Sequence, residues 1–310
     1  MSLSLSLRHA WPLTKQTVTA WIDDYAPSMG AALSYYTVFS LAPLLLIVIA
    51  IAGLVFGADA ARGALFGELS SMMGAEAAKA IESMLAGASK PSDGAIASTV
   101  GVVALLIGAT TVFGELQNAL DRIWQVPEKD KPSGLMGLLR TRFLSFGLIL
   151  GIAFLLMVSL VAGTAVTALG KWWGPMFGAR EALAQGVTFV VGLAVSTVGF
   201  AMIYKLMPRV QVRWADVWVG AAVTALLFTL GRFLISIYIG TTDVASGYGA
   251  AGSLVVVFVW VYYSAQIFLL GAEFTWVFAT TLGSRKDLAQ HADGSTNDTT
   301  AVEQAPRKTA

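Results

Sequence analysis

The sequence predicts an all-α membrane protein, a bundle of six transmembrane helices, from three observations. Hydrophobic residues make up 56% of the 310 residues. Charged residues make up only 13%, whereas an ordinary soluble domain carries about 25%. The apolar residues form continuous runs instead of alternating with polar ones. This pattern favours helices over a membrane β-barrel, because a helix satisfies its own backbone hydrogen bonds in lipid.

Six apolar runs are long enough to cross a bilayer, which takes about 20 residues. They lie at residues 30–56, 96–114, 143–169, 182–206, 217–239 and 251–282. The second run is the shortest, and we expect its helix to continue through the segment ELQNALDRIW. Because the connections are short, we predict one transmembrane domain, residues 30–283, and no separable domains.

Two further segments have amphipathic patterns. The N-terminal segment, residues 1–29, predicts a helix on the membrane surface, because its apolar residues recur at helical spacing: Trp11, Val18, Trp21, Ile22 and Tyr25. The longest loop, residues 57–95, predicts two short helices that lie on the outer leaflet or cap the bundle. Their apolar positions are Leu65, Leu69, Met72, Met73, Ile81, Met84 and Leu85. We expect the polar tail, residues 284–310, to be disordered and cytoplasmic.

The distribution of basic residues predicts the orientation, because cytoplasmic loops carry an excess of lysine and arginine. One side holds twelve: Arg8, Lys15, Arg122, Lys129, Lys131, Arg140, Arg142, Lys205, Arg209, Arg213, Arg285 and Lys286. The other side holds five: Arg62, Lys79, Lys90, Lys171 and Arg180. Both termini are therefore expected in the cytoplasm.

Several classes of function conflict with the composition. The chain has no cysteine, and its two histidines, His9 and His291, lie in the terminal segments. We therefore expect no catalytic residue, no metal site, no cofactor and no enzymatic activity. A net charge of +1 gives no sign of nucleic-acid binding, and no Gly-rich Lys-Ser/Thr motif indicates a nucleotide.

The run LLFTLGRFLISIYIG, residues 226–240, contains one charged residue, Arg232. An arginine at the centre of a membrane helix costs roughly 2.5–3.5 kcal/mol on insertion scales. In one interpretation Arg232 reaches the outer headgroups or pairs with Asp243, which is a structural role. In the other it faces a polar cavity and holds an anionic group such as a lipid phosphate, which suits the planar guanidinium.

The sixth span carries Gln266 near the membrane midplane and Glu273 about 33 Å from its start, at 1.5 Å per residue. Glu273 therefore lies too far toward the cytoplasm for an ion pair with Arg232. Basic residues of the inner side are better candidate partners for it, namely Arg122, Lys205, Arg209 and Arg213.

A further polar cluster ends the second span. Spacings of three and four residues place its members on one helix face: Glu115, Asn118, and Asp121 or Arg122. They either brace helices against each other or form a substrate or ion site. In the first span, Pro43 is either a tolerated kink or a hinge.

Four segments resemble the YihY / virulence factor BrkB family of bacterial inner-membrane proteins. They are AALSYYTVFSLAPLLLIVIA (31–50), FGELQNALDRIWQV (113–126), YKLMP (204–208) and YGAAGSLVVVFVWVYYSAQIFLLGAEF (248–274). One departure is Asp121, where the family pattern leads us to expect asparagine. The resemblance implies six helices in the inner membrane with both ends inside, and a proposed involvement in envelope lipid traffic.

Some members of that family carry a ribonuclease BN label, which the residues let us test. A ribonuclease needs metal-binding carboxylates or an acid/base pair and a basic surface. This chain offers neither, so we reject the nuclease. Two hypotheses remain: a transporter or flippase-like protein for an amphipathic anion such as a lipid or envelope precursor, and a non-transporting scaffold or envelope-assembly factor. Both imply membrane lipids as partners, and a homo-oligomer is compatible with either.

Overall fold

The computed structural model describes residues 7–88, 95–127, 180–241 and 251–286, together with five single residues, Gly147, Leu150, Gly151, Phe154 and Tyr248. All regular secondary structure in these residues is helical. The helices are α1 (Leu7–Asp23), α2 (Ala26–Phe56), α3 (Ala58–Met73), α4 (Ala75–Ala88), α5 (Ala95–Ile123), α7 (Arg180–Leu206), α8 (Trp214–Thr241) and α9 (Gly252–Thr281).

Four of these helices contain a stretch long and apolar enough to cross a membrane: Ala26–Phe56, Phe189–Leu206, Trp214–Ile239 and Gly252–Thr281. The second predicted span forms α5, which continues to Ile123 as expected. The third predicted span, residues 143–169, lies almost entirely outside the described residues. Large apolar side chains on the bundle surface are exposed, among them Leu54 at 88% and Phe233 at 64%. Such a surface requires lipid around it, because exposed apolar patches of this kind are rare on soluble monomers.

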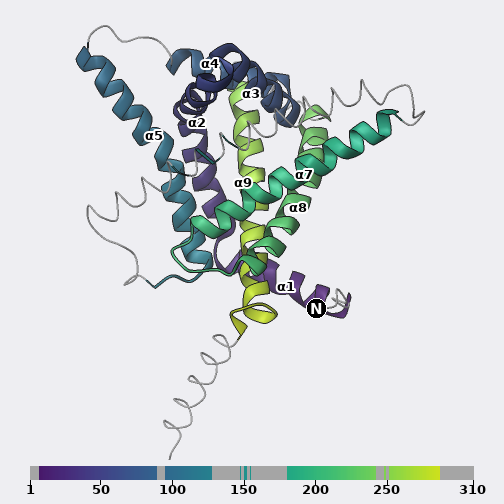
Figure 1. Ribbon diagram of the computed structural model, residues 1–310. Helices are drawn as coiled ribbons and strands as arrows, with labels where there is room; N and C mark the ends of the chain where they lie inside the picture. The colour runs from purple at the N-terminus through teal and green to yellow at the C-terminus, as the bar shows by residue number, and fades with distance from the viewer. Residues whose placement is uncertain are drawn as a thin grey trace, which may run out of the picture.

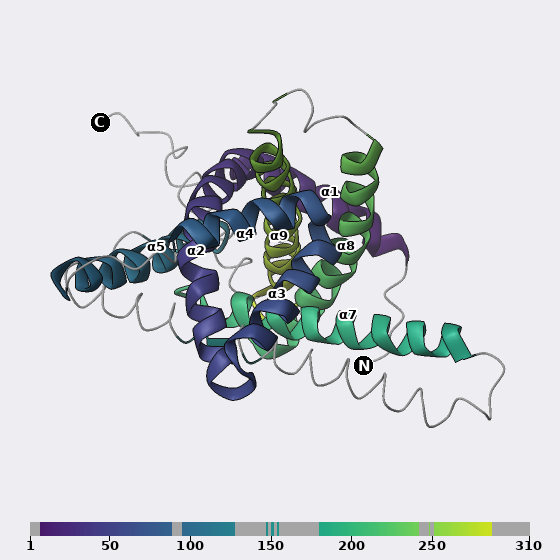
Figure 2. The ribbon, with the colours of Figure 1, turned by 90° about the horizontal axis from the view of Figure 1, so that it is seen from above.

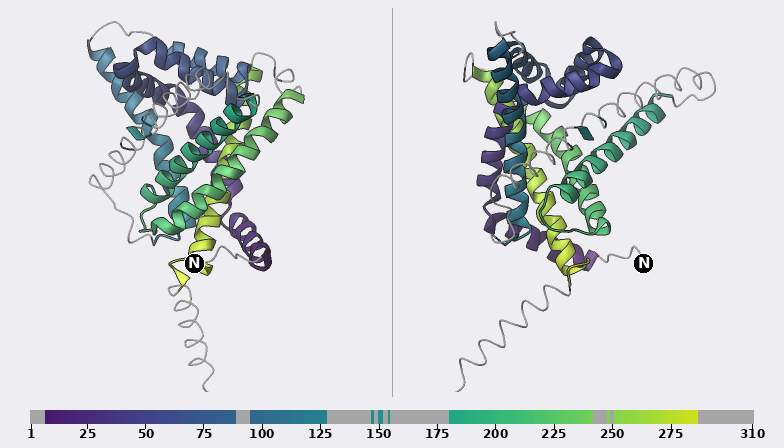
Figure 3. Two further views of the ribbon diagram at one scale, coloured as in Figure 1. Left: turned by 45° about the vertical axis from the view of Figure 1, so that its right-hand side comes forward. Right: turned by 60° about the vertical axis from the view of Figure 1, so that its left-hand side comes forward.

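The central element is α9, which packs against α1, α2, α4, α5 and α8 (Figure 1). Two further views show α7 running obliquely past this centre (Figure 3), where it packs on α8, whereas α5 packs on α2. Buried apolar side chains of α9 contribute to both hydrophobic cores: Phe268, Leu269 and Ala272 belong to one, and Val256, Val257 and Val261 to the other. The position of α9 therefore decides where most other helices lie.

Helices α8 and α9 cross at a reciprocal pair of glycine–threonine contacts. A Cβ atom added to Gly220 of α8 would lie 1.9 Å from Thr275 Oγ1, and one added to Gly271 of α9 would lie 2.0 Å from Thr224 Oγ1. Each threonine hydroxyl donates to the carbonyl four residues earlier on its own helix, which is Gly220 for Thr224 and Gly271 for Thr275. Small residues of this kind let membrane helices approach closely, where dispersion contacts accumulate.

The two short helices predicted in the long loop are confirmed as α3 and α4. They lie across one end of the bundle, over α2 and α9 (Figure 2). The predicted apolar positions point inward: Leu65, Met73, Ile81 and Leu85 are all buried in one core with α2 and α9. Gly57 and Gly74, with φ of 86° and 87°, make the turns before and after α3, a conformation that glycine adopts without steric cost. This end is called the α3–α4 end below.

The predicted N-terminal helix is confirmed as α1. It lies across the opposite end of α9, called the α1 end below. Its face toward the bundle is buried at Leu13 and Thr17, whereas Trp11 is 75% exposed and Ile22 57%. The chain then turns at Tyr25, which has a left-handed backbone with φ 56° and ψ 38°. This conformation costs a non-glycine residue roughly 1–2 kcal/mol, and it lets α2 start directly after α1.

We expect Gly271→Ala to destabilise the protein by about 1–3 kcal/mol, because the new methyl group overpacks the contact with Thr224. Thermal unfolding of the purified protein in detergent measures the effect. The penalty should be smaller in a Thr224→Ala background, where the obstructing hydroxyl is absent. Gly114→Ala is the matched control, because a Cβ there meets nothing within 4 Å. Equal stability of Gly271→Ala and Gly114→Ala would contradict the tight crossing.

Candidate functional site

Most of the charged side chains singled out from the sequence meet at the α1 end. The last turn of α5, the α7–α8 connection, the Tyr25 turn and the last turns of α9 all lie there. Two arrangements must be distinguished in this region. One is a set of charges that bind one another, and the other is a buried acid that has no partner.

Arg209, in the α7–α8 connection, forms several charged contacts with described residues of α5. Its Nη1 donates to Asp121 Oδ2 at 2.7 Å, and its backbone N–H donates to Asp121 Oδ1 at 2.9 Å. Its Nη2 donates to Gln117 Oε1 at 3.1 Å. Gln117 in turn donates from Nε2 to the carbonyl of Met207 at 2.9 Å. These bonds join α5 to the α7–α8 connection.

The Asp121–Arg209 pair agrees with the expectation that this cluster braces helices. Asp121 has no exposed side-chain surface and Arg209 retains 16%, so the charges are removed from water together and need each other. Gln117 was missed by the sequence analysis, although it lies one helical turn before Asp121. An asparagine at 121 could not form the same ion pair, so the departure from the family pattern has a physical consequence here.

Two further contacts close the α1 end. Asp216 of α8 is buried and accepts hydrogen bonds from the backbone and hydroxyl of Ser284, directly after α9. Arg285 then lies over the ring of Trp124, 5.3 Å from its centroid. The polar tail predicted from Ser284 onward therefore begins with residues held against the bundle. Residues 287–310 lie outside the described residues.

Glu273 is different, because it is fully buried and has no basic partner among the described residues. Its exposed fraction is 0%, and neither carboxyl oxygen has a hydrogen-bond partner in the described part of the chain. The prediction that Arg122, Lys205, Arg209 or Arg213 pairs with it is wrong. Three of these have other contacts: Arg122 with Asp24, Lys205 with the carbonyl of Val212, and Arg209 with Asp121.

Another acid, Asp24 in the turn between α1 and α2, lies close enough to Glu273 to interact with it. Asp24 retains 27% side-chain exposure, and one of its oxygens lies 3.8 Å from Arg122 Nε. Partial burial raises the pKa of Asp24 above its ordinary value of 3.8, and the Arg122 guanidinium opposes this rise. Arg122 also lies over the ring of Tyr25, 5.2 Å from its centroid. The sequence analysis did not single out Asp24, because no local pattern connects it to α9.

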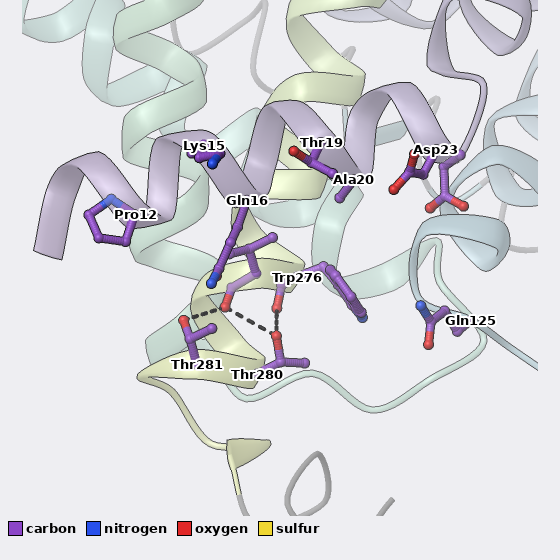
Figure 4. Close-up of a pocket in the computed structure, with 12 residues that line it drawn as sticks. Pro12, Lys15, Gln16, Thr19, Ala20, Asp23, Gln125, Trp276, Thr280 and Thr281 are labelled. Carbon is purple, nitrogen blue, oxygen red and sulfur yellow. Dashed lines mark hydrogen bonds between the residues drawn. The ribbon is translucent and has the colours of Figure 1, made fainter. Parts of the chain in front are cut away.

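A groove of about 620 Å³ leads to this acid pair from the α1 end. It lies between α1 and the last turns of α9, and Figure 4 shows Lys15, Gln16 and Thr19 on α1 above Trp276, Thr280 and Thr281 on α9. Asp23, Asp24 and Gln125 complete its wall. Glu273 precedes Trp276 by three residues, so it lies about one turn deeper along α9.

Gln266 is the second unpaired polar side chain of α9. Its amide nitrogen and oxygen are buried and lack hydrogen-bond partners in the described residues. The amide packs on Gly30 of α2, where an added Cβ would lie 1.9 Å from Gln266 Nε2. Gln266 and Glu273 are seven residues apart, which is two helical turns, so both lie on one face of α9 about 10 Å apart.

Arg232 lies elsewhere. The residue before it, Gly231, packs closely on Ile267 and Tyr263 of α9, which places Arg232 about 9–15 Å along the helix axis from Glu273. No ion pair joins the two, as their depths predict. Arg232 is partly buried and has no hydrogen bond or ion pair to a described residue. Asp243, its predicted structural partner, lies outside the described residues.

The remaining predicted residues are dispersed. Glu115 is partly buried and Asn118 is exposed, whereas Asp121 is buried beside Arg209 and Arg122 turns to Asp24. The four therefore do not form one site. Pro43 lies within α2, and its ring lies 3.0 Å from where a Cβ on Gly108 of α5 would stand, so the two helices approach each other there. Among the described residues, no group of three histidine, aspartate or glutamate side chains could hold a metal ion.

The fold and this arrangement define a class: an α-helical, multi-pass membrane protein with ionisable side chains inside the bundle. The family model for virulence factor BrkB matches residues 17–295, and the chain belongs to this family, that of the YihY and UPF0761 membrane proteins. No solved structure matches the chain.

The relatives are moderately similar in sequence. A UPF0761 membrane protein of Pseudomonas aeruginosa strain LESB58 is 26% identical over 256 residues, which cover 81% of this chain and 59% of that protein. One from Ralstonia nicotianae is 27% identical over 255 residues, covering 81% and 55%. The UPF0761 membrane protein YihY of Escherichia coli O1:K1 / APEC is 28% identical over 202 residues, covering 65% and 64%. The chain thus spans about three-fifths of the length of these curated relatives.

We expect Arg209→Gln to destabilise the protein by about 3–5 kcal/mol, because it leaves the Asp121 carboxylate buried without its cation. Thermal unfolding in detergent measures the change, and Asp121→Asn in the same chain should recover part of it. Arg213→Gln is the control, because Arg213 is nearby but exposed. A loss no greater than that of the control would mean that the brace contributes nothing.

We expect Asp24→Asn to stabilise the protein relative to the native chain increasingly as the pH rises. A raised pKa means that the folded state holds the Asp24 proton more tightly than the unfolded state does. Native stability therefore falls as the pH rises from the ordinary value of 3.8 through the raised one, and asparagine does not titrate. Unfolding midpoints of both proteins at about pH 4 and about pH 7 test this expectation. If the stability advantage of Asp24→Asn over the native protein became smaller with rising pH, the effect of Arg122 on the pKa of Asp24 would outweigh the effect of burial.

Proposed function

We propose that this protein moves an amphipathic anion, such as a lipid or an envelope precursor, across the bacterial inner membrane. One observation carries the proposal: two charged side chains, Glu273 and Arg232, have no partner of opposite charge in the described chain although both belong to membrane-spanning helices. A charge at membrane depth is costly and marks a functional site by default. A transporter leaves such groups unpaired because its substrate or coupling ion pairs with them in turn.

Arg232 is the residue proposed to hold the anion. Its guanidinium keeps its charge and presents a planar fork of donors, which matches two oxygens of a phosphate or carboxylate. The neighbouring Gly231 fits closely against α9, so the backbone that carries Arg232 is firmly placed. The adjoining Phe233 and Leu234 are 64% and 50% exposed, which suits contact with the acyl chains of an amphipathic substrate.

The proposed orientation places the α1 end in the cytoplasm. The excess of lysine and arginine at this end supports it through the positive-inside rule, and the groove beside α1 then opens to the cytoplasm. Glu273 lies between this groove and the level of Arg232. The chain carries no nucleotide-binding motif, so a gradient, a partner protein or the imbalance of the lipid itself is the proposed source of energy.

A non-transporting scaffold is the second candidate, and the network around Arg209 favours it. There the hydrogen bonds among Asp121, Arg209, Gln117 and the Met207 carbonyl hold α5 against the α7–α8 connection. A scaffold accounts for these contacts but not for the unpaired Glu273 and Gln266, which cost stability without bracing anything.

Leaflet exchange of a headgroup-labelled anionic lipid in liposomes tests the proposal. Quenching from outside should show exchange well above empty liposomes for the native protein, and a loss of about tenfold or more in Arg232→Leu, because one charged contact to an anion is worth roughly 1.5–3 kcal/mol. Glu273→Gln should also slow exchange.

Arg62→Gln is the matched control, because Arg62 is an exposed arginine on α3 and should leave exchange unchanged. All variants must elute as the native protein does in size-exclusion chromatography. Native protein that exchanges lipid no faster than empty liposomes would refute movement of that lipid and favour the scaffold.

A further inference from the structure

We propose that the carboxyl groups of Glu273 and Asp24 form a proton-binding site that takes one proton from the groove beside α1. This proposal deepens the proposed function, and the role of the proton site in transport rests on that function. It is carried by the burial of Glu273, by its lack of a partner, and by the position of Asp24 between Glu273 and the groove.

The surroundings of Glu273 fit a proton better than any larger cation. Its side chain has no exposed surface, and the groove reaches Asp24 but not Glu273 itself. A metal cation needs several oxygen ligands around it, and no group of three acidic or histidine side chains among the described residues is placed to hold one. A proton needs no such space, because it is passed from one oxygen to the next.

Two facing carboxylates in a buried place repel each other, and one shared proton removes the repulsion. The proton converts one acid into a donor, so that Glu273 and Asp24 can form the hydrogen bond that Glu273 otherwise lacks. A negative charge remains on the pair, and Arg122, 3.8 Å from Asp24, balances it. The occupied site is therefore close to neutral, and the empty site carries an excess negative charge.

Other charged groups near this end do not compensate Glu273. On α1, Lys15 and Asp23 line the groove, and Asp23 is exposed. Among the described basic residues, Arg122 forms an ion pair with this acid pair, through Asp24, and the adjacent Asp23 adds a negative charge. The described charges of the neighbouring helices are bound elsewhere or make no ion pair with these two acids. Asp121 of α5 and Arg209 bind each other, Asp216 of α8 binds Ser284, and Lys205 of α7 binds Val212. Glu115 of α5 and Arg232 of α8 have no ion pair with either acid, and α2 has no charged residue.

The site lies where the turn between α1 and α2 contacts α9, and the charge of the site can change how closely the two pack. Asp24 belongs to the turn that connects α1 to α2, whereas Glu273 belongs to α9. A proton on the pair favours close packing of the turn on α9, and its loss favours separation. Gln266, two turns deeper on the same face of α9, supplies the next unpaired polar group toward the membrane centre.

Infrared spectroscopy of the purified protein, without any lipid substrate, tests the site by the carbonyl stretch of a protonated carboxyl group. Between about pH 9 and about pH 5, the native protein should gain one such band. Glu273→Gln should abolish it. Asp24→Asn should keep it but lower its midpoint by about one pH unit, because a neighbouring negative charge is gone.

Asp216→Asn is the matched control, since Asp216 is a buried acid that already accepts hydrogen bonds from Ser284, and its spectrum should keep the band. The proposal is overturned if the native protein lacks the band, or if sodium removes it at constant pH, which would indicate a metal-cation site. If Glu273→Gln does not fold, an unshifted midpoint in Asp24→Asn overturns it. A band without lipid exchange would refute only the proposed function, and exchange without the band only the proton site.

Discussion

The close crossing of α8 and α9 is the contact on which the remaining structure depends. Gly220 and Gly271 remove the side chains that would separate the two helices, and Thr224 and Thr275 fill the space while bonding back to their own helices. The Tyr204 hydroxyl of α7 donates to the carbonyl of Phe268 and lies 3.1 Å from Thr224 Oγ1, so a third helix joins at the same level. With α9 held in this way, its opposite face is directed at α2 and the Tyr25 turn, and Gln266 and Glu273 lie on that face.

The buried polar groups of the bundle fall into two sets. One set has hydrogen-bond partners and stabilises the fold, and the other lacks them and underlies the proposed function. Water is scarce at membrane depth, so each buried polar atom must find its partner inside the protein. Asp121, Arg209 and Gln117 meet this requirement through one another, and they join α5 to the α7–α8 connection. Glu273 and Gln266 do not meet it. These two unsatisfied groups on one face of α9 lower the stability of the protein. The proposed transport path would have this property, because the transported substrate or ion would complete their contacts.

The α1 end combines an unusual backbone, an acid pair and a groove within a few residues. Tyr25 holds a left-handed conformation, and it connects Asp24 to the first turn of α2. Strained backbone of this kind persists where surrounding contacts impose it, and here Arg122 contacts both Tyr25 and Asp24. The turn is therefore a junction at which the charge of one acid pair can influence the packing of α1, α2 and α9 together.

The sequence by itself determined the class of protein, most helices and the two short helices α3 and α4 at one end of the bundle, because these depend on local periodicity and on the length of apolar runs. It also identified Asp121, Gln266 and Glu273 as polar groups worth attention, since each stands out against an apolar background. Only the tertiary structure decided which of them have partners. Arg209 lies 88 residues from Asp121 in the sequence, and Asp24 and Glu273 are 249 residues apart in the sequence. A local sequence pattern cannot predict contacts between residues so far apart in the sequence, because these contacts depend on how α9 crosses α8 and on where the Tyr25 turn ends.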